Sequence, residues 1–216
     1  QSIRTNLGFV VSGDEAMERV WSETCTFAEA GRIILIHGKT GSGKEFVAKA
    51  IHKLTRDNGN PFVAVNVAAL ANSVMHSELF GHVKGSFTNA DEARRGRITE
   101  AQDGTLFLDE IAKMPLDFQE MLLRVLDDDR EFQQVGSDRN ISSTATIVCA
   151  TNRSLREMVQ NGEFHEDLYH RINRFPIRIP ALDERSVPYK RALIRALVLK
   201  QGSGCKITPE AVEHLC

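Results

Sequence analysis

The chain has 216 residues, of which 42% are hydrophobic, and this is enough for one sizeable core. Its formal net charge is −2 with both signs interspersed, so the composition excludes the basic face of a protein that grips DNA mainly through the phosphate backbone. The four cysteines form no C-x-x-C pair, which excludes the common zinc and redox motifs, and no apolar run approaches the ~18 residues of a membrane helix. We therefore expect a cytoplasmic protein with reduced thiols, no signal peptide and no membrane contact.

Helical and strand patterns alternate along the chain, which predicts an α/β fold with a mostly parallel sheet. A first helix, capped by Ser12 or Asp14, runs to about Ala30. Short apolar runs predict five strands at 32–37, 61–67, 105–110, 144–152 and 174–179. The helix EFVAKAIHKL follows the first strand, and PLDFQEMLLRVLDDD lies between the third and fourth.

After Pro180 the pattern changes to two helical segments, VPYKRALIRALVLKQG and TPEAVEHLC. They predict the start of a separate helical element. Because the sequence begins with Gln1 and stops at Cys216 directly after a helical pattern, we expect it to be a fragment of a longer protein.

The segment GKTGSGKE fits the phosphate-binding pattern G-x-x-x-x-G-K, with an apolar strand before it and a helix after it. Glycines let backbone N–H groups turn toward one point, the helix N-terminus adds partial positive charge, and the lysine can reach the β- and γ-phosphates. A Gly-rich turn without a ligand is the alternative. The motif predicts a nucleotide site at Gly38, Lys39, Thr40, Gly41, Ser42, Gly43, Lys44 and Glu45.

Two carboxylates, Asp109 and Glu110, end the apolar run TLFLDE, at the strand end where open α/β sheets bind ligands. Asp109 is expected to hold Mg²⁺, directly or through water, and Glu110 to polarise the attacking water. An acidic helix cap is the alternative. P-loops usually carry a Ser or Thr hydroxyl for the metal at the position where this chain has Glu45. With Asp109 and Glu110 present, metal binding does not depend on that hydroxyl. Glu45 can order the water molecules around the metal or face away from it.

Asparagines follow two further apolar strands. Asn152 can sense the γ-phosphate or orient the water, and Asn66 can hydrogen-bond Glu110, although each can also be a turn-forming residue. The segment HEDLYH is rejected as a zinc motif, because His165 and His170 are five residues apart and would lie about 140° apart around a helix.

The run ELFGHVKGSFTNA, residues 78–90, closely resembles ELFGHEKGAFTGA, a signature of the bacterial enhancer-binding proteins, the AAA+ ATPases that activate sigma-54 RNA polymerase. GKTGSGKE is similar to the family's GESGTGKE, which also ends in Glu. FVAVNVAAL, GTLFLDEI, LLRVLDDDREFQQVGS, IVCATNRSL and FHEDLYHRINRFPIRIPAL match the family in order and spacing. The resemblance extends from about Leu7 to Glu213.

This resemblance implies a P-loop NTPase (AAA+) fold: a three-layer α/β/α core over residues 1–182, followed by the truncated start of a helical lid at 183–216. It implies a hexameric or heptameric ring with ATP between subunits, where Arg171 is an arginine finger toward the neighbour, Asn152 a sensor and Asn66 a switch for Glu110. For Arg171 the alternative is a surface ion pair, which the residue by itself would favour. The loop at 85–90 would contact sigma-54 through Phe87 and Thr88. Regulatory and helix-turn-helix DNA-binding domains would lie outside this sequence.

Several positions depart from the family pattern. Ser86 and Asn89 replace Ala and Gly in the loop, His165 replaces a first Arg, and Asp183 replaces an Arg. Two functions therefore remain. The chain is the ATP-hydrolysing domain of a sigma-54-dependent activator, or it is a degenerate regulator that uses nucleotide binding as an assembly switch without sigma-54 activation.

Overall fold

The computed structural model describes residues 13–56, 59–86 and 91–200, with side chains placed up to residue 197. The loop residues Phe87 and Thr88 and the helix expected at TPEAVEHLC lie outside the described residues.

Five parallel strands form the central sheet of the described chain, in the order β2-β5-β8-β1-β9. They are β1 (Ile33–His37), β2 (Phe62–Asn66), β5 (Thr105–Asp109), β8 (Thr146–Thr151) and β9 (Pro176–Arg178). Each matches one of the five apolar runs. The predicted α/β fold with a parallel five-stranded sheet is therefore confirmed.

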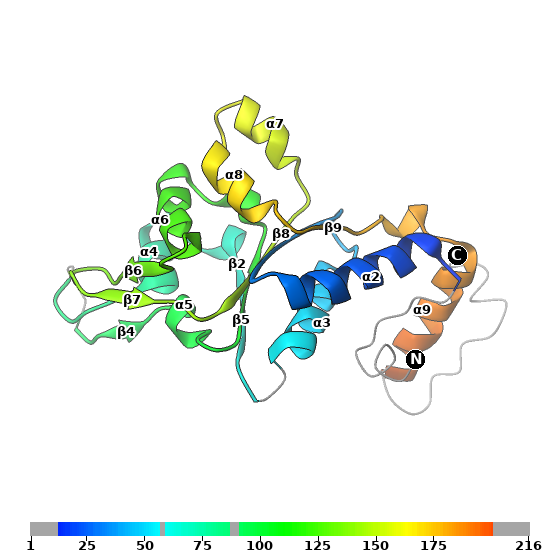
Figure 1. The fold of residues 1–216 in the computed structure, drawn as a ribbon, viewed down its shortest axis with the longest axis horizontal. Helices are drawn as coiled ribbons and strands as arrows, with labels where there is room; N and C mark the ends of the chain where they lie inside the picture. Colours follow the sequence, from blue (N-terminus) through cyan, green and yellow to red (C-terminus); the bar gives the residue numbers. More distant parts are fainter. Residues whose placement is uncertain (1–12, 57–58, 87–90, 201–216) are drawn as a thin grey trace.

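Helices cover both faces of this sheet and make the expected three layers. Figure 1 shows α2 and α3 on one side and α6 and α8 on the other, and two separate clusters of buried side chains fill these interfaces. The helices are α2 (Glu15–Ala30), α3 (Lys44–Arg56), α4 (Asn72–Phe80), α5 (Arg97–Glu100), α6 (Leu116–Leu126), α7 (Leu155–Gln160), α8 (Glu166–Ile172) and α9 (Val187–Lys200). Short 3-10 turns are η1 (Val67–Ala69), η2 (Ile111–Lys113) and η3 (Leu182–Glu184).

The strands read as continuous apolar runs because both of their faces are buried. In β8, Ile147 and Cys149 pack into the cluster on the α6 side, whereas Val148 and Ala150 pack into the cluster on the α3 side. A strand that is covered by helices on both faces does not alternate polar and apolar residues, because neither face contacts water.

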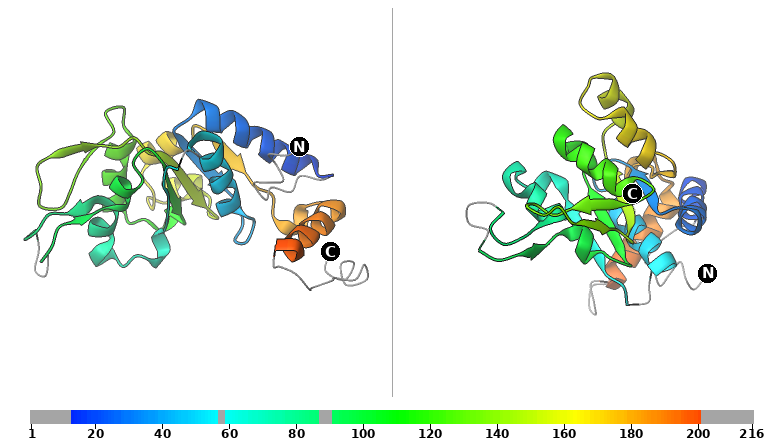
Figure 2. Two further views of the ribbon diagram at one scale, coloured as in Figure 1. Left: turned by 90° about the horizontal axis from the view of Figure 1, so that it is seen from below. Right: turned by 60° about the vertical axis from the view of Figure 1, so that its left-hand side comes forward.

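Asp14 joins the two ends of the described chain. Its Oδ1 accepts a hydrogen bond from Met17 N (3.0 Å) and so caps α2, while its Oδ2 accepts one from Ser186 N (2.7 Å), just before α9. Figure 2 shows the start of α2 and α9 at the same end of the molecule. The division at residue 182 into core and lid stays a prediction.

Two short hairpins extend from the opposite end (Figure 1), and the sequence did not predict them. One pairs β3 (Gly81–His82) with β4 (Arg94–Arg95), and the other pairs β6 (Glu131–Gln133) with β7 (Asn140–Ser142). The first hairpin is the stem of the loop at 85–90.

Candidate active site

The carboxyl ends of the parallel strands bring most of the predicted site residues to one edge of the sheet. Strand register pairs Asn66 with Asp109 and His37 with Thr151. The loop that follows β1 is fixed to this edge, because Gly38 N donates to Thr151 O (3.1 Å). Ligands bind at such an edge in open α/β sheets.

The loop between β1 and α3 has a backbone that needs glycine. Gly41 and Gly43 have φ values of 77° and 95°, in the left-handed region that side chains rarely enter. At Gly38, a Cβ atom would lie 2.5 Å from Ser42 Oγ and 3.1 Å from Ile179 O, so the loop also packs too closely for a side chain there. These conformations turn the loop back over the first turn of α3.

Lys44 lies at the centre of this loop and is only 7% exposed. Its Nζ donates to Gly38 O (3.1 Å) and Lys39 O (3.4 Å). An ammonium group has three N–H donors, so these two carbonyls leave one for an anion. A buried lysine held by carbonyl oxygens at a helix N-terminus is suited to bind phosphate.

Asp109 and Glu110 lie at the end of β5, and both are half-buried. Asp109 Oδ1 accepts a hydrogen bond from Glu110 N (3.0 Å), which leaves Asp109 Oδ2 available as a ligand. Glu110 has φ 55° and ψ 43°, a left-handed conformation that is unusual for a side-chain-bearing residue. Such backbone strain concentrates at functional sites.

The two predicted asparagines make different contacts. Asn152 Nδ2 donates to Thr40 Oγ1 (3.0 Å), which joins the end of β8 to the glycine loop. Asn66 Oδ1 accepts from Ala68 N (3.0 Å) and caps η1, so in this structure its hydrogen bond goes to Ala68 and not to Glu110. Glu45 is exposed and its carboxylate pairs with Lys49 Nζ (2.6 Å) along α3.

A cavity of about 280 Å³ adjoins the glycine loop. Its walls are mainly apolar and come from α2, α3, η3 and α9, with Phe46, Leu182, Tyr189 and Leu193 among them. Sequence reasoning missed this cavity because its residues lie in four elements far apart in the chain. A larger cavity of about 530 Å³ between α4, α6 and the β6–β7 hairpin contains none of the predicted site residues.

His37 ends β1 beside the glycine loop. Burial lowers the pKa of its imidazole, and the neighbouring charges of Arg178 and Lys44 lower it further. His37 is therefore neutral at physiological pH and adds no competing positive charge next to Lys44.

Arg171 lies apart from the glycine loop, on α8. Its Nε donates to Leu126 O (2.8 Å), and its Nη2 lies 3.2 Å from carboxylate oxygens of both Asp127 and Asp128. The structure therefore does not bring Arg171 together with Lys44 and Asp109 within one subunit. His165 Nε2 contacts Leu116 O (3.1 Å).

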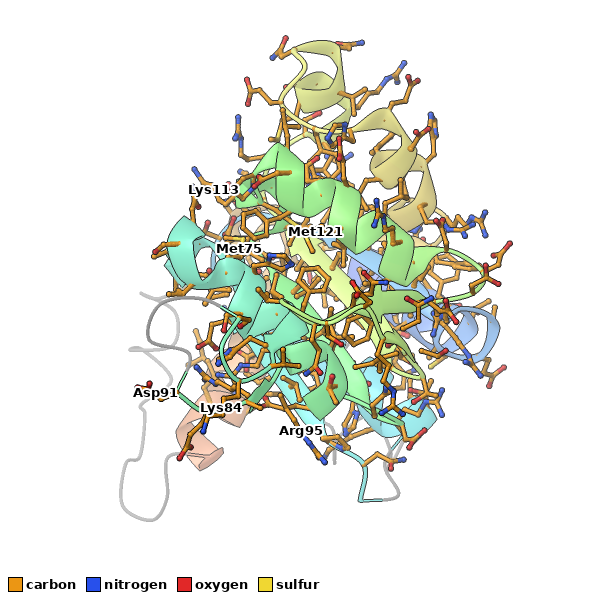
Figure 3. All side chains as sticks on the ribbon, turned by 90° about the vertical axis from the view of Figure 1, so that its left-hand side faces the viewer. Met75, Lys84, Asp91, Arg95, Lys113 and Met121 are labelled. Atoms are coloured by element: carbon orange, nitrogen blue, oxygen red, sulfur yellow. The ribbon has the colours of Figure 1, made fainter. Side chains whose placement is uncertain are left out.

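The stem of the 85–90 loop is fixed by His82. Its Nε2 is 2.9 Å from Glu92 O, which can only accept, so this nitrogen carries the proton and Nδ1 accepts from Ser77 Oγ at 2.7 Å. Val83 N donates to Val135 O (3.1 Å), which joins the stem to the segment after β6. Figure 3 views this end, with Lys84, Asp91 and Arg95 at its lower edge and Met75 and Met121 above them.

Within the described part of the chain, no group of three or more His, Cys, Asp or Glu residues could hold a metal by itself. At nucleotide sites Mg²⁺ is typically held by one or two carboxylates together with substrate phosphates, and Asp109 has a carboxylate oxygen of that kind. No helix among the described residues is long and apolar enough to cross a membrane.

The glycine loop with its buried lysine follows β1, and two carboxylates end β5, which β8 separates from β1 in the same parallel sheet. This arrangement defines a P-loop nucleoside triphosphatase fold of the AAA+ type. The comparison with protein families identifies one family. Residues 10–178 match the model of the sigma-54 interaction domain, and the chain belongs to this family.

Curated relatives agree. The chain is 43% identical over 208 residues to the Nif-specific regulatory protein of Herbaspirillum seropedicae, covering 94% of this chain and 38% of that protein. It is 43% identical over 178 residues to the regulatory protein AtoC of Escherichia coli, covering 82% of this chain and 38% of that protein. The chain thus spans about two fifths of the length of these relatives.

Solved structures show the same fold. NtrX from Brucella abortus matches with a TM-score of 0.80 and 33% identity over 97% of this chain and 47% of that one. NtrX in complex with ATP matches with a TM-score of 0.77 and 34% identity over 94% of this chain and 47% of that one. Hsp104 of S. cerevisiae in its ADP complex, at 17% identity and a TM-score of 0.67 over 99% of this chain and 42% of that one, shares the fold alone.

Proposed function

We propose that the chain binds ATP and hydrolyses it with Mg²⁺, as the motor domain of a sigma-54-dependent transcriptional activator. The observation that carries this proposal is the position of Lys44, buried at the centre of the glycine loop, at the same edge of the sheet as the acidic end of β5. The relatives support it because they are named as regulatory proteins, and NtrX was solved with ATP.

Different residues of the chain would bind the nucleotide, activate the attacking water and hold the metal. Backbone N–H groups of the glycine loop and Lys44 bind the phosphates, and the apolar cavity beside Tyr189 accepts the adenine base. Glu110 takes the proton of the attacking water, and Asn152 orients that water or senses the γ-phosphate. Asp109 would hold Mg²⁺, which when bound neutralises charge on the phosphate oxygens.

Asn66 and Arg171 have proposed roles that depend on a neighbouring strand and a neighbouring subunit. Asn66 and Asp109 are register partners, so the Asn66 amide lies one strand away from the acidic pair and can exchange Ala68 N for Glu110. Arg171 contacts the end of α6 and not the glycine loop, and we propose that it reaches the nucleotide of a neighbouring subunit in a hexameric or heptameric ring.

A Lys44→Ala variant of the whole protein tests the nucleotide site. Losing the charge-assisted bonds should weaken ATP binding roughly tenfold to a hundredfold and abolish measurable hydrolysis. The matched control is Lys49→Ala, because Lys49 is an exposed lysine on the same helix whose ion pair among the described residues is with Glu45. Unchanged ATP turnover in Lys44→Ala would refute the site.

The proposed partner is the sigma-54 RNA polymerase holoenzyme, contacted through Phe87 and Thr88; DNA would be bound by a separate domain, and the protein would work in the cytoplasm. The test is co-migration with purified sigma-54 after trapping with ADP and a metal-fluoride mimic of the γ-phosphate. Phe87→Ala should lose the complex and keep hydrolysis, whereas truncation of the exposed Leu54 on α3 should change neither. Hydrolysis without any trap-dependent complex would favour the nucleotide-switched regulator instead.

A further inference from the structure

Arg185 connects the glycine loop to the first helix after the core. It lies between η3 and α9, and only 6% of its surface is exposed. Its Nη2 donates to Ser42 O in the glycine loop, and its Nη1 donates to Tyr189 Oη (3.0 Å) in the first turn of α9. Its Nε and Nη2 also donate to Pro180 O, at 3.2 and 2.9 Å.

Arg185 is buried, and neutral groups accept its hydrogen bonds. Among the ion pairs of the described residues, none includes Arg185, and its acceptors are two carbonyl oxygens and one hydroxyl. The guanidinium centre lies 5.2 Å from the centre of the Tyr189 ring, close enough for a cation–π contact. A buried cation is costly, so its retention here indicates that holding these three acceptors together matters.

The bond to Ser42 O controls the direction of a neighbouring N–H group. The carbonyl of Ser42 and the N–H of Gly43 belong to one peptide plane, and the described chain has no cis peptide bond. In a trans peptide these two groups point in opposite directions. Arg185 therefore holds the Gly43 N–H away from itself, at a glycine, whose missing side chain would otherwise let this peptide plane turn more easily.

A second, solvent-exposed contact joins the glycine loop to η3. Lys39 Nζ lies 3.7 Å from Asp183 Oδ2 and 4.0 Å from Glu184 Oε1. Exposed ion pairs of this kind contribute little, so Arg185 is the residue that determines the connection.

We propose that Arg185 is a positioning residue for the nucleotide: it orients the Gly43 N–H of the glycine loop and fixes Tyr189 in the wall of the base cavity. It does this from the side opposite the phosphates and touches no phosphate itself. The nucleotide part rests on the proposed function. The mechanical part, a fixed connection between the glycine loop and α9, does not.

Hydrogen–deuterium exchange of the nucleotide-free whole protein tests the connection. Arg185→Lys keeps the charge but replaces the planar guanidinium fork, whose separate nitrogens reach acceptors on different segments, with a single ammonium nitrogen. Exchange should therefore rise together in peptides covering residues 41–47 and 187–193. Tyr189→Phe removes only the hydroxyl acceptor, so exchange should rise at α9 and stay unchanged at the glycine loop. Arg139→Lys, at an exposed arginine in the β6–β7 hairpin, is the matched control.

Calorimetric titration with ADP tests the positioning role on the same variants. Arg185→Lys should weaken ADP binding by about tenfold to a hundredfold, while the control Arg139→Lys should remain within about threefold of the unaltered protein. Circular dichroism compares the folds of the variants.

Each outcome decides the proposal. Joint exchange at both segments with weakened ADP binding supports it. Increased exchange confined to α9, or unchanged ADP affinity in Arg185→Lys, overturns it. If the unaltered protein fails to bind ADP, the proposed function is refuted, and so is the role of Arg185 in nucleotide binding. The exchange data would still report whether Arg185 holds the glycine loop.

Discussion

Cys149 shows how strongly the centre of the sheet excludes water. It lies in the middle of β8 with none of its surface exposed, and burial raises the pKa of its thiol to about 12. At pH 8 the folded protein should therefore contain almost no Cys149 thiolate. We expect Cys149 to react with a thiol reagent on the order of a thousandfold more slowly than the half-buried Cys25 on α2, until denaturant is added.

The measurement is mass-spectrometric mapping of labelled cysteines against time. The direction of the pH dependence follows from the raised pKa. Burial of the neutral thiol stabilises the fold fully below the unfolded thiol pKa of about 8.5, and this contribution is lost as the pH rises toward 12. Equal labelling rates for the two cysteines in native protein would contradict the buried position of β8.

At the residue scale, sequence patterns located the side chains that sit near each other in the chain. The glycine spacing gave Gly41, Gly43 and Lys44 because one loop carries all three. Arg185 was not found, because its acceptor Ser42 is 143 positions away and only the tertiary fold brings them together. The hydrogen-bond partner of Asn66 also could not be predicted from the sequence pattern. An asparagine at the end of a strand can cap its own turn or face a neighbouring strand.

Asp14 acts at the scale of whole elements, since it caps α2 and fixes the residue before α9. Burial alone would raise the pKa of its carboxyl, but hydrogen bonds from Ser186 and Met17 outweigh this effect and lower it. An Asp14→Asn substitution keeps one acceptor oxygen and removes the charge. We expect it to reduce the free energy of unfolding at pH 7 by about 1–2 kcal/mol, measured by urea denaturation.

The pH dependence separates this effect from simple loss of packing. Because the folded pKa lies below the unfolded value of about 3.9, the stabilisation by Asp14 is present above that value and is lost as the pH falls through the folded pKa. The difference between the two proteins should therefore shrink at acidic pH. Glu15→Gln, at an exposed acid in the same turn, is the control; an equal loss there would exclude the cap.

Elements with a strong local signal were predicted, and those formed by distant pairing were not. The five strands are apolar because both faces are covered, and α2 begins at a capping aspartate. By contrast, α4 begins after Ala71 without a side-chain cap. The strands β3 and β4 have two residues each, and the exposed Arg94 and Arg95 pair only because His82 and Gly81 lie opposite them.

At the scale of the whole molecule, the position of Arg171 bears on the proposed ring. Arg171 is held at the end of α6 by Leu126 O, Asp127 and Asp128, while Glu110 lies at the end of β5. With the proposed roles of Glu110 as base and Arg171 as arginine finger, one subunit would supply only the base to its own site. A head-to-tail ring would place the arginine of each subunit against the nucleotide of the next.

This arrangement predicts complementation between two inactive variants. Arg171→Ala keeps its own Glu110, and Glu110→Gln keeps its own Arg171. Equal mixing should complete roughly a quarter of the interfaces in a heterologous ring, so ATP hydrolysis should return to about that fraction of the unaltered rate. Mixing Lys44→Ala with Glu110→Gln is the control, since every nucleotide site then lacks a residue of its own and no activity should return. If Arg171→Ala remains inactive in every mixture, while size-exclusion chromatography shows that mixed rings form, Arg171 serves its own subunit through the contact with α6 and does not act across the interface.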